Sequence, residues 1–230
     1  MEKKAILAGA SGSVGSSLLL QLLACKQYSH VLVLVRKELR MQHPKLKQLV
    51  IDFDRLSDYS SEITGDVVFC CLGTTKSQTP DQQQYRKIDY QYPLDIAWIA
   101  QVNGAESYHL ISSIGANKDS SAFYIRTKGE LERDLKAVPF KNIHIYRPSL
   151  LDGARQQRRL LEESINAVMY FLNPLLVGGL KKYRSIKVET IAAAMIKQSL
   201  NDDRGIFIYE SDQIARLGTE EKLPLHLNPA

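Results

Sequence analysis

Three side chains suited to proton transfer occur close together near the middle of the chain: Ser113, Tyr124 and Lys128. Tyr124 and Lys128 are four residues apart in a segment whose apolar positions predict a helix, so both side chains lie on one helix face. Carbonyl reduction needs a proton donor at the forming alkoxide, and a phenol can serve when a neighbouring ammonium favours its phenolate form. Ser113 supplies a hydroxyl that can hold the substrate carbonyl. These residues predict hydride transfer to or from a carbonyl or alcohol, with Lys128 also bound to the cofactor ribose.

A Tyr and a Lys four residues apart are also common on ordinary helix surfaces, so the prediction depends on a cofactor site elsewhere. Residues 5–8 form an apolar run of strand type, and residues 14–23 predict an apolar helix. The turn between them has the spacing Gly9-x-x-Gly12-x-x-Gly15, which is typical of dinucleotide-binding folds but also fits an ordinary strand-to-helix turn. The N–H groups of such a helix start can bind a pyrophosphate. We expect cofactor contacts from Gly9, Ser11, Gly12, Ser13, Val14 and Gly15.

The second predicted strand indicates which dinucleotide is bound. Residues 30–35 are almost all apolar, as in strands that are buried on both faces of a parallel sheet. The strand ends in Arg36, roughly twenty residues beyond the glycine turn, where this fold meets the adenine ribose. An acidic residue there would bind the free 2′-hydroxyl of NAD, whereas an Arg suits the 2′-phosphate of NADP. Arg36, followed by Lys37, therefore favours NADP(H) over NAD(H), unless it is only a charged residue at a strand end.

Two further strand ends are expected at the same site. Residues 49–51 lead into Asp52 and Phe53, which could hold the adenine amino group and pack on its ring; Asp52 could equally cap the following turn. A fourth strand, residues 66–72, is followed by a glycine and two threonines. Ligands bind beyond the carboxyl ends of such strands. We therefore expect cofactor contacts from Leu72, Gly73 and Thr74.

The rest of the chain continues the alternation of strands and helices. Thr79 is the expected N-cap of a helix that runs to about Val102, with an interruption at Pro93. Strands are expected at residues 108–111 and 142–146. Six strands alternating with helices predict an α/β fold, a Rossmann-like doubly wound parallel sheet.

We expect one NAD(P)-binding domain over residues 1–218. Residues 1–149 would form the cofactor-binding core, and residues 150–218 a small C-terminal lid that contacts the substrate. Within the lid we expect helices at 160–172 and 188–200, a loop at 173–183, a strand at 206–209 and a helical turn at 212–217. Residues 219–230 would be a poorly ordered tail.

Composition restricts the partners. The net charge is +5, but Lys and Arg are scattered and not interleaved with aromatic residues, so we expect no nucleic-acid binding. No apolar run reaches the length of a membrane span, so we expect no membrane partner. The three cysteines and five histidines have no disulfide or metal-ligand spacing, so we expect no metal and a cytoplasmic location. The protein would be a monomer or a homodimer.

The motifs Gly9-x-x-Gly12-x-x-Gly15, Tyr124-x-x-x-Lys128 and Arg147-Pro148, with Ser113 between the first two, resemble an atypical or extended short-chain dehydrogenase/reductase. Residues 112–116, 124–130 and 214–218 further resemble the Tat-interacting-protein branch, close to NmrA-like and sugar-nucleotide-epimerase-like proteins. This resemblance implies NADP(H) held over Gly12 and Gly73, and a catalytic triad of Ser113, Tyr124 and Lys128. We also expect Pro148 beside the cofactor.

The chain departs from the better-characterised enzymes of this class at one position of the helix before the fifth strand. Many of them hold a proton-relay water with an Asn there, whereas this chain has Asp89, which presents no amide donor. We therefore keep two functions open. The first is an NADP(H)-dependent oxidoreductase acting on a small carbonyl or alcohol. The alternative is an NADP(H)-binding sensor or interaction protein with little or no turnover.

Overall fold

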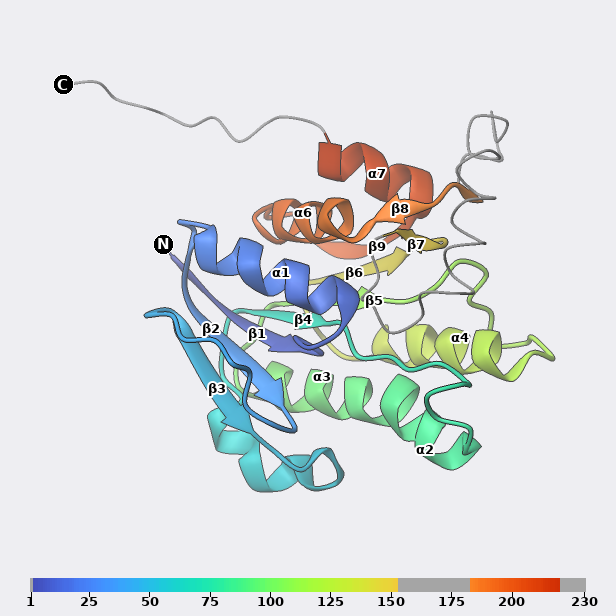
Figure 1. Cartoon of the computed structure of the whole chain (residues 1–230), viewed down its shortest axis with the longest axis horizontal. Helices are drawn as coiled ribbons and strands as arrows, with labels where there is room; N and C mark the ends of the chain where they lie inside the picture. The colour runs from blue at the N-terminus through green and yellow to red at the C-terminus, as the bar shows by residue number, and fades with distance from the viewer. Residues whose placement is uncertain (1, 153–182, 220–230) are drawn as a thin grey trace.

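A computed structural model describes residues 2–152 and 183–219, and its centre is a seven-stranded parallel sheet (Figure 1). The strand order is β3-β2-β1-β4-β5-β6-β9. The strands are β1 (Lys3–Ala8), β2 (Tyr28–Val35), β3 (Leu46–Val50), β4 (Val67–Cys70), β5 (Ser107–Ile111), β6 (Asn142–Arg147) and β9 (Gly205–Glu210). The order reverses between β1 and β4, which is where open sheets of this kind bind ligands.

Helices cover both faces of the sheet (Figure 1). One face carries α1 (Ser13–Ala24), α6 (Val188–Ser199) and α7 (Ser211–Thr219). The other carries the 3-10 helix η1 (Phe53–Glu62), α2 (Gln82–Arg86), the π-helix η2 (Lys87–Gln91), α3 (Tyr92–Val102) and α4 (Phe123–Leu135). Each face has its own hydrophobic core. This architecture confirms the predicted Rossmann-like α/β fold.

The helix expected from Thr79 to Val102 is broken into three pieces. Asp81, not Thr79, is the N-cap of α2, because its carboxylate accepts the N–H groups of Gln83 and Gln84. The Thr79 hydroxyl bonds instead to that of Thr74, at 2.8 Å. A π-helical turn then precedes α3, and Pro93 lies in its first turn. Proline has no N–H for the helical ladder, so the interruption expected at this residue takes the form of a wider turn.

Part of the segment expected to form a lid belongs to the main layers. β9 pairs with β6 as the seventh strand of the sheet, and α6 packs against α1. A second, two-stranded sheet joins β7 (Leu151–Asp152) to β8 (Ile186–Lys187). The expected helix at 160–172 and nearly all of the loop at 173–183 lie outside the described residues. The division into a core and a lid therefore stays a prediction.

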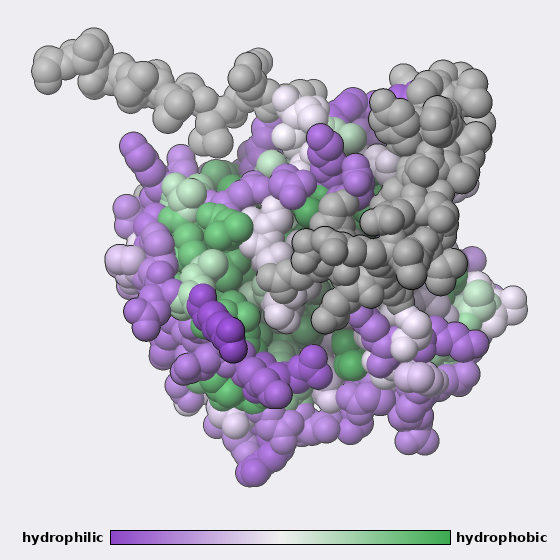
Figure 2. Space-filling model, in the orientation of Figure 1, coloured by the Kyte–Doolittle hydropathy of each residue, from purple (hydrophilic) through white to green (hydrophobic). Residues whose placement is uncertain are grey.

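Hydrophobic residues also reach the surface over α1 (Figure 2). This helix is apolar around most of its circumference: it buries Leu18, Leu19, Leu22 and Leu23 but leaves Leu20 57% exposed. In the parts of the chain that the structure describes, no helix is long and apolar enough to cross a bilayer.

Two buried histidines stack between neighbouring strands. His109 on β5 and His144 on β6 have ring centroids 4.4 Å apart and nearly parallel rings. Phe207 stacks on the outer side of His144, and Phe69 packs at a tilt against His109. Burial holds the pKa of His109 well below its usual value and lowers that of His144 to about 4. Both rings are therefore neutral in the folded protein at neutral pH.

This stack makes stability depend on pH. The unfolded chain takes up protons on these histidines below about pH 6.5, whereas the folded chain does not until about pH 4 for His144, so stability falls as the pH drops through this interval. We expect His144 alone to account for a loss on the order of 3 kcal/mol between neutral pH and pH 4. Urea denaturation at several pH values measures this loss.

The variant His144→Phe keeps a ring in the stack, and the hydroxyl of Tyr209 keeps Gln198 as its partner. Its stability should fall less steeply below pH 6.5 than that of the parent protein. The matched control is His30→Gln at an exposed position, which should keep the parent slope. Identical slopes for His144→Phe and the parent would contradict the assignment.

Candidate active site

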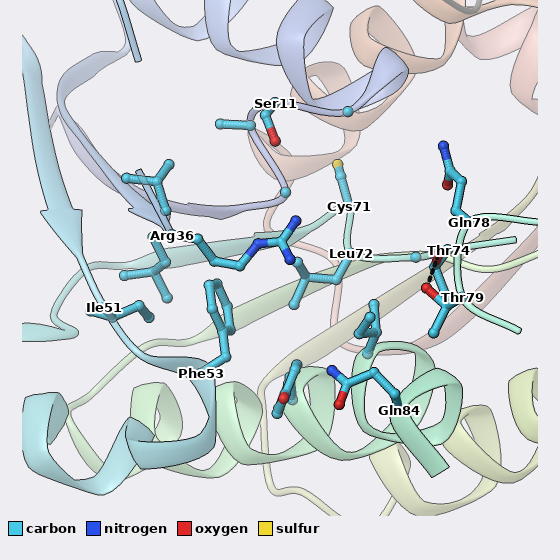
Figure 3. A pocket seen from close by; sticks show the side chains of 18 of the residues that line it. Ser11, Arg36, Ile51, Phe53, Cys71, Leu72, Thr74, Gln78, Thr79 and Gln84 are labelled. Carbon is cyan, nitrogen blue, oxygen red and sulfur yellow. Dashed lines mark hydrogen bonds between the residues drawn. The ribbon is translucent and has the colours of Figure 1, made fainter. Parts of the chain in front are cut away.

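A pocket of about 850 Å³ opens at the carboxyl ends of β1, β2 and β4, where the strand order reverses (Figure 3). Nine of the predicted cofactor residues line it: Gly9, Ser11, Gly12, Arg36, Asp52, Phe53, Leu72, Gly73 and Thr74. Sequence reasoning missed other lining residues, among them Ala10, Asp54, Gln78, Thr79, Gln84, Ile88 and Tyr92. Several of these residues lie in α2, in η2 and in the loop before them. The sequence predicted one helix here, so it did not show which side chains of this segment face the pocket.

The glycine turn brings the start of α1 close to the ends of β1 and β4. Gly9 has a φ of +85°, and a Cβ there would lie 2.5 Å from the carbonyl oxygen of Cys71. A Cβ on Gly15 would collide with the carbonyl oxygen of Gly9, so only glycine lets α1 begin this close to β1. Gly12 is the N-cap of α1 and has no side chain to cap it, which leaves the first N–H groups for an anion. Ser13, Val14 and Gly15 form the first turn of α1 and are not among the residues that line the pocket, so their expected contact with the cofactor stays a prediction.

The far end of the pocket contains the side chains expected at the adenosine. Arg36 is exposed and extends into the pocket, and the ring of Phe53 also faces it (Figure 3). The Asp52 carboxylate accepts the N–H of Asp54 at 3.0 Å, so the capping role left open by the sequence is observed. Asp52 also lines the pocket, and its contact with adenine stays a prediction.

Asp54 brings an unexpected negative charge to this end of the pocket, but it is already paired. Its carboxylate lies 2.8 Å from the ammonium of Lys87 and 2.8 Å from the hydroxyl of Tyr92. These two hydrogen bonds hold the pKa of Asp54 below its usual value. Lys87 therefore offsets the charge of Asp54, and Arg36 is the one cation among the described residues that line the pocket.

At the other end, Lys128 forms a buried ion pair with Asp89. Its Nζ lies 2.9 Å from Asp89 Oδ1, with the side chains 4% and 0% exposed. Asp89 Oδ2 accepts the N–H of Thr74 at 2.8 Å, and a Cβ on Gly73 would lie 3.6 Å from Lys128 Nζ. Burial lowers the pKa of Lys128, but the charge of Asp89 and that of an ionised Tyr124 outweigh burial and raise it. Lys128 is therefore a fixed cation beside the glycine that lines the cofactor pocket.

Tyr124 lines a second pocket instead of the first. This pocket has a volume of about 480 Å³ and shares Thr74 and Thr79 with the larger one, so the two are adjacent. Tyr124 is 40% exposed, one turn of α4 before Lys128. Ser113 follows β5, and its Oγ is buried with no hydrogen-bond partner among residues 2–152 and 183–219. An unpaired buried hydroxyl is what a site for a polar ligand atom would leave.

A second buried charge cluster, which sequence reasoning missed, fixes α4 to the sheet. Glu132 is 2% exposed and accepts hydrogen bonds from Ser112 Oγ at 2.5 Å and from Arg147 Nη2 at 2.6 Å. Arg147 also reaches Glu210 on β9, at 3.3 Å. The sequence could have indicated that Glu132 is buried, because it lies one turn after Lys128 on the face of α4 that points inward.

Pro148 lies apart from both pockets in the described structure. Its carbonyl oxygen accepts the N–H of Ile114 at 3.0 Å, which ties the end of β6 to the turn that carries Ser113. Its expected contact with the cofactor stays a prediction.

Comparison with known proteins gives the family. A model of an NAD(P)H-binding family matches residues 9–170. Protein HTATIP2 of Rattus norvegicus is 30% identical over 227 residues, covering 96% of this chain and 92% of that protein. Protein fmp52-1, mitochondrial, of Aspergillus terreus is 29% identical over 225 residues, covering 95% of this chain and 97% of that protein.

Among solved structures, the Bordetella bronchiseptica enzyme WbmH in complex with NAD+ has the same fold. It superimposes with a TM-score of 0.69 at 14% identity, over 91% of this chain and 76% of that one. A likeness at this identity concerns the fold alone. With the glycine turn, the pocket at the strand-order reversal and the relatives just described, the chain belongs to the NAD(P)H-binding family, in the Tat-interacting-protein branch that includes HTATIP2.

Proposed function

We propose that this protein is an NADP(H)-dependent oxidoreductase that interconverts a small carbonyl compound and its alcohol. The observation that carries the proposal is the adjacency of the two pockets. The larger one is lined by the residues expected to hold a dinucleotide, and it meets the pocket of Tyr124 at Thr74 and Thr79. A hydride donor in the first pocket and a proton donor in the second would thus face the same substrate carbon and oxygen.

Each part of the site has a defined task in this proposal. When bound, the cofactor supplies or accepts the hydride. The first turn of α1 would bind its pyrophosphate and Arg36 its 2′-phosphate. Lys128, held by Asp89, would bind the nicotinamide ribose. Tyr124 would give the proton to the substrate oxygen, and the hydroxyl of Ser113 would orient that oxygen.

One observation supports the second candidate, an NADP(H)-binding sensor or interaction protein. Many related enzymes hold a proton-relay water with an Asn at the position of Asp89. Here the carboxylate of Asp89 contacts Lys128 directly and is fully buried. Without an amide donor to hold that water, the site would favour cofactor binding over turnover.

We also propose a location in the cell. The sequence favours the cytoplasm, whereas the name of the Aspergillus terreus relative assigns that protein to mitochondria.

The preference for NADP(H) is tested at Arg36. We expect Arg36→Ala to weaken NADPH binding about tenfold or more, because a charge-assisted hydrogen bond is worth roughly 1.5–3 kcal/mol, and to leave NADH binding unchanged. Dissociation constants for both cofactors are measured at one salt concentration. The control is Arg55→Ala, which removes a guanidinium that pairs with Asp58 and does not line the pocket. Equal affinities of the parent protein for NADPH and NADH would contradict the prediction.

Tyr124 separates the two candidate functions. We expect Tyr124→Phe to keep NADPH binding but to lower carbonyl reduction by on the order of a hundredfold or more, because it removes the proton donor and keeps the ring. Tyr90→Phe is the matched control, since the Tyr90 hydroxyl bonds to Asp134 and lines neither pocket. If no compound in a broad carbonyl panel oxidises NADPH, the sensor is favoured. If Tyr124→Phe is as active as the parent, the assignment of Tyr124 is wrong.

The ion pair of Lys128 is tested by stability and binding together. Asp89→Asn keeps an acceptor for the N–H of Thr74 but leaves a buried ammonium without its counter-charge, which should cost about 3 kcal/mol or more of unfolding free energy. The double variant Asp89→Asn with Lys128→Met removes both charges and should recover most of that loss. NADPH affinity should not recover with it, because Lys128 is gone. Recovery of both quantities would show that the pair is structural only.

A further inference from the structure

The pocket beside Tyr124, which we call the aromatic pocket, has walls suited to a particular class of ligand. Three aromatic rings line it: Tyr85 from α2, and Phe123 and Tyr124 from the start of α4. The ring of Tyr85 meets that of Phe123 edge to face at 5.6 Å and that of Tyr124 at 6.2 Å. Pro80 and Ala122 add further apolar surface. The rings form one wall of the pocket, and the polar residues Thr74, Thr75, Lys76, Thr79 and Gln82 also line it.

These walls are already in place without a ligand. Tyr85 is only 3% exposed, and its hydroxyl donates to the carbonyl oxygen of Thr74 at 3.2 Å. Asp81 fixes the start of α2 by accepting two N–H groups. Phe123 and Tyr124 stand on the first turn of α4, which the buried pairs of Lys128 and Glu132 hold against the sheet. A preformed pocket loses little ordering entropy when a rigid, flat ligand enters.

The charged side chains of the aromatic pocket further restrict the class of ligand that it can bind. Among the described residues that line it, Lys76 is the one charged side chain, and no carboxylate accompanies it. An exposed lysine disfavours a cationic ligand and tolerates a neutral or anionic one. The diphosphate of a nucleotide sugar is usually bound by several cations, whereas Lys76 is the one cation among the described residues that line this pocket.

We propose that the aromatic pocket takes a flat aromatic aldehyde or ketone, neutral or anionic, as the substrate whose carbonyl meets Tyr124. This inference rests on the proposed oxidoreductase function and names its substrate class. The ring of the substrate would pack among Tyr85, Phe123 and Tyr124, as aromatic rings pack edge to face or offset against one another. When bound, NADPH would supply a hydride to the carbonyl carbon and become NADP+. Tyr124 would give its proton to the carbonyl oxygen, which completes the alcohol, and the Tyr124 phenolate would take up a proton from solvent.

The first experiment compares two aldehydes of similar shape that differ in aromaticity. Benzaldehyde and cyclohexanecarboxaldehyde are offered to the parent protein with NADPH, and kcat/KM is measured from NADPH oxidation. We expect benzaldehyde to be favoured by on the order of tenfold, because each aromatic pair adds to the burial of area alone. Charge is tested with 4-carboxybenzaldehyde against 4-(trimethylammonio)benzaldehyde, of which the anion should be favoured. The variant Lys76→Met should reduce that preference, and Lys118→Met, outside the pocket, should not.

The second experiment measures binding without turnover. Benzamide and cyclohexanecarboxamide are not reduced, so their dissociation constants for the NADPH complex are obtained by calorimetry. Benzamide should bind several-fold more tightly, and Phe123→Leu should abolish the difference while leaving the dissociation constant of NADPH unchanged. The control Phe207→Leu makes the same substitution in the histidine stack and should keep the preference for benzamide.

These outcomes separate the inference from the function on which it rests. Tyr124-dependent turnover that favours the saturated aldehyde, or does not distinguish the two, overturns the aromatic class and leaves the oxidoreductase standing. Absence of all turnover, with benzamide still preferred through Phe123, overturns the oxidoreductase and supports the ligand class. Tighter binding of UDP-glucose than of benzamide overturns the inference in favour of a nucleotide sugar.

Discussion

The buried ion pair between Asp89 and Lys128 joins the parts of the site that have to keep a fixed distance. Burying an ion in a protein costs roughly several kcal/mol of desolvation free energy. The attraction between the two ions offsets this cost only while both are present. Asp89 is completely buried and also holds the N–H of Thr74. The loop after β4, the π-helical turn and α4 are therefore tied together at one carboxylate, beneath the boundary of the two pockets.

The π-helical turn explains how Asp89 can reach this point. A regular helix through residues 82–102 would carry its side chains inward at intervals of three or four residues. Pro93 interrupts the ladder, and the wider turn at Lys87–Gln91 changes the direction of Asp89 relative to α3. One turn further along the same inward face of α4, Glu132 binds Ser112 and Arg147 at the ends of β5 and β6. Two buried charged side chains, Lys128 and Glu132, thus fix successive turns of α4 to the sheet and to η2.

The parts of this structure that could be predicted are those set by local sequence. The glycine turn, the apolar strands and the residues at their carboxyl ends depend on nearby residues and on one rule of sheet topology, and nine of the expected cofactor residues do line one pocket. The features that the sequence did not predict depend on contacts between segments that are far apart in the chain. Asp89 and Lys128 are 39 positions apart, a separation that no periodicity reveals. The strand at residues 206–209 was expected, but its pairing with β6 is identified only by the folded sheet.

The same ion pair bears on the choice between enzyme and sensor. The Asp89 carboxylate lies in direct contact with the Lys128 ammonium, at 2.9 Å, where many related enzymes have an Asn. Tyr124, however, is 40% exposed and lines a pocket, so its hydroxyl does not depend on a buried relay to exchange protons with solvent. The direct contact at Asp89 therefore does not separate Tyr124 from solvent. An exposed phenol beside a buried cation is an arrangement that general acid catalysis can use, and it supports the proposed oxidoreductase over the proposed sensor.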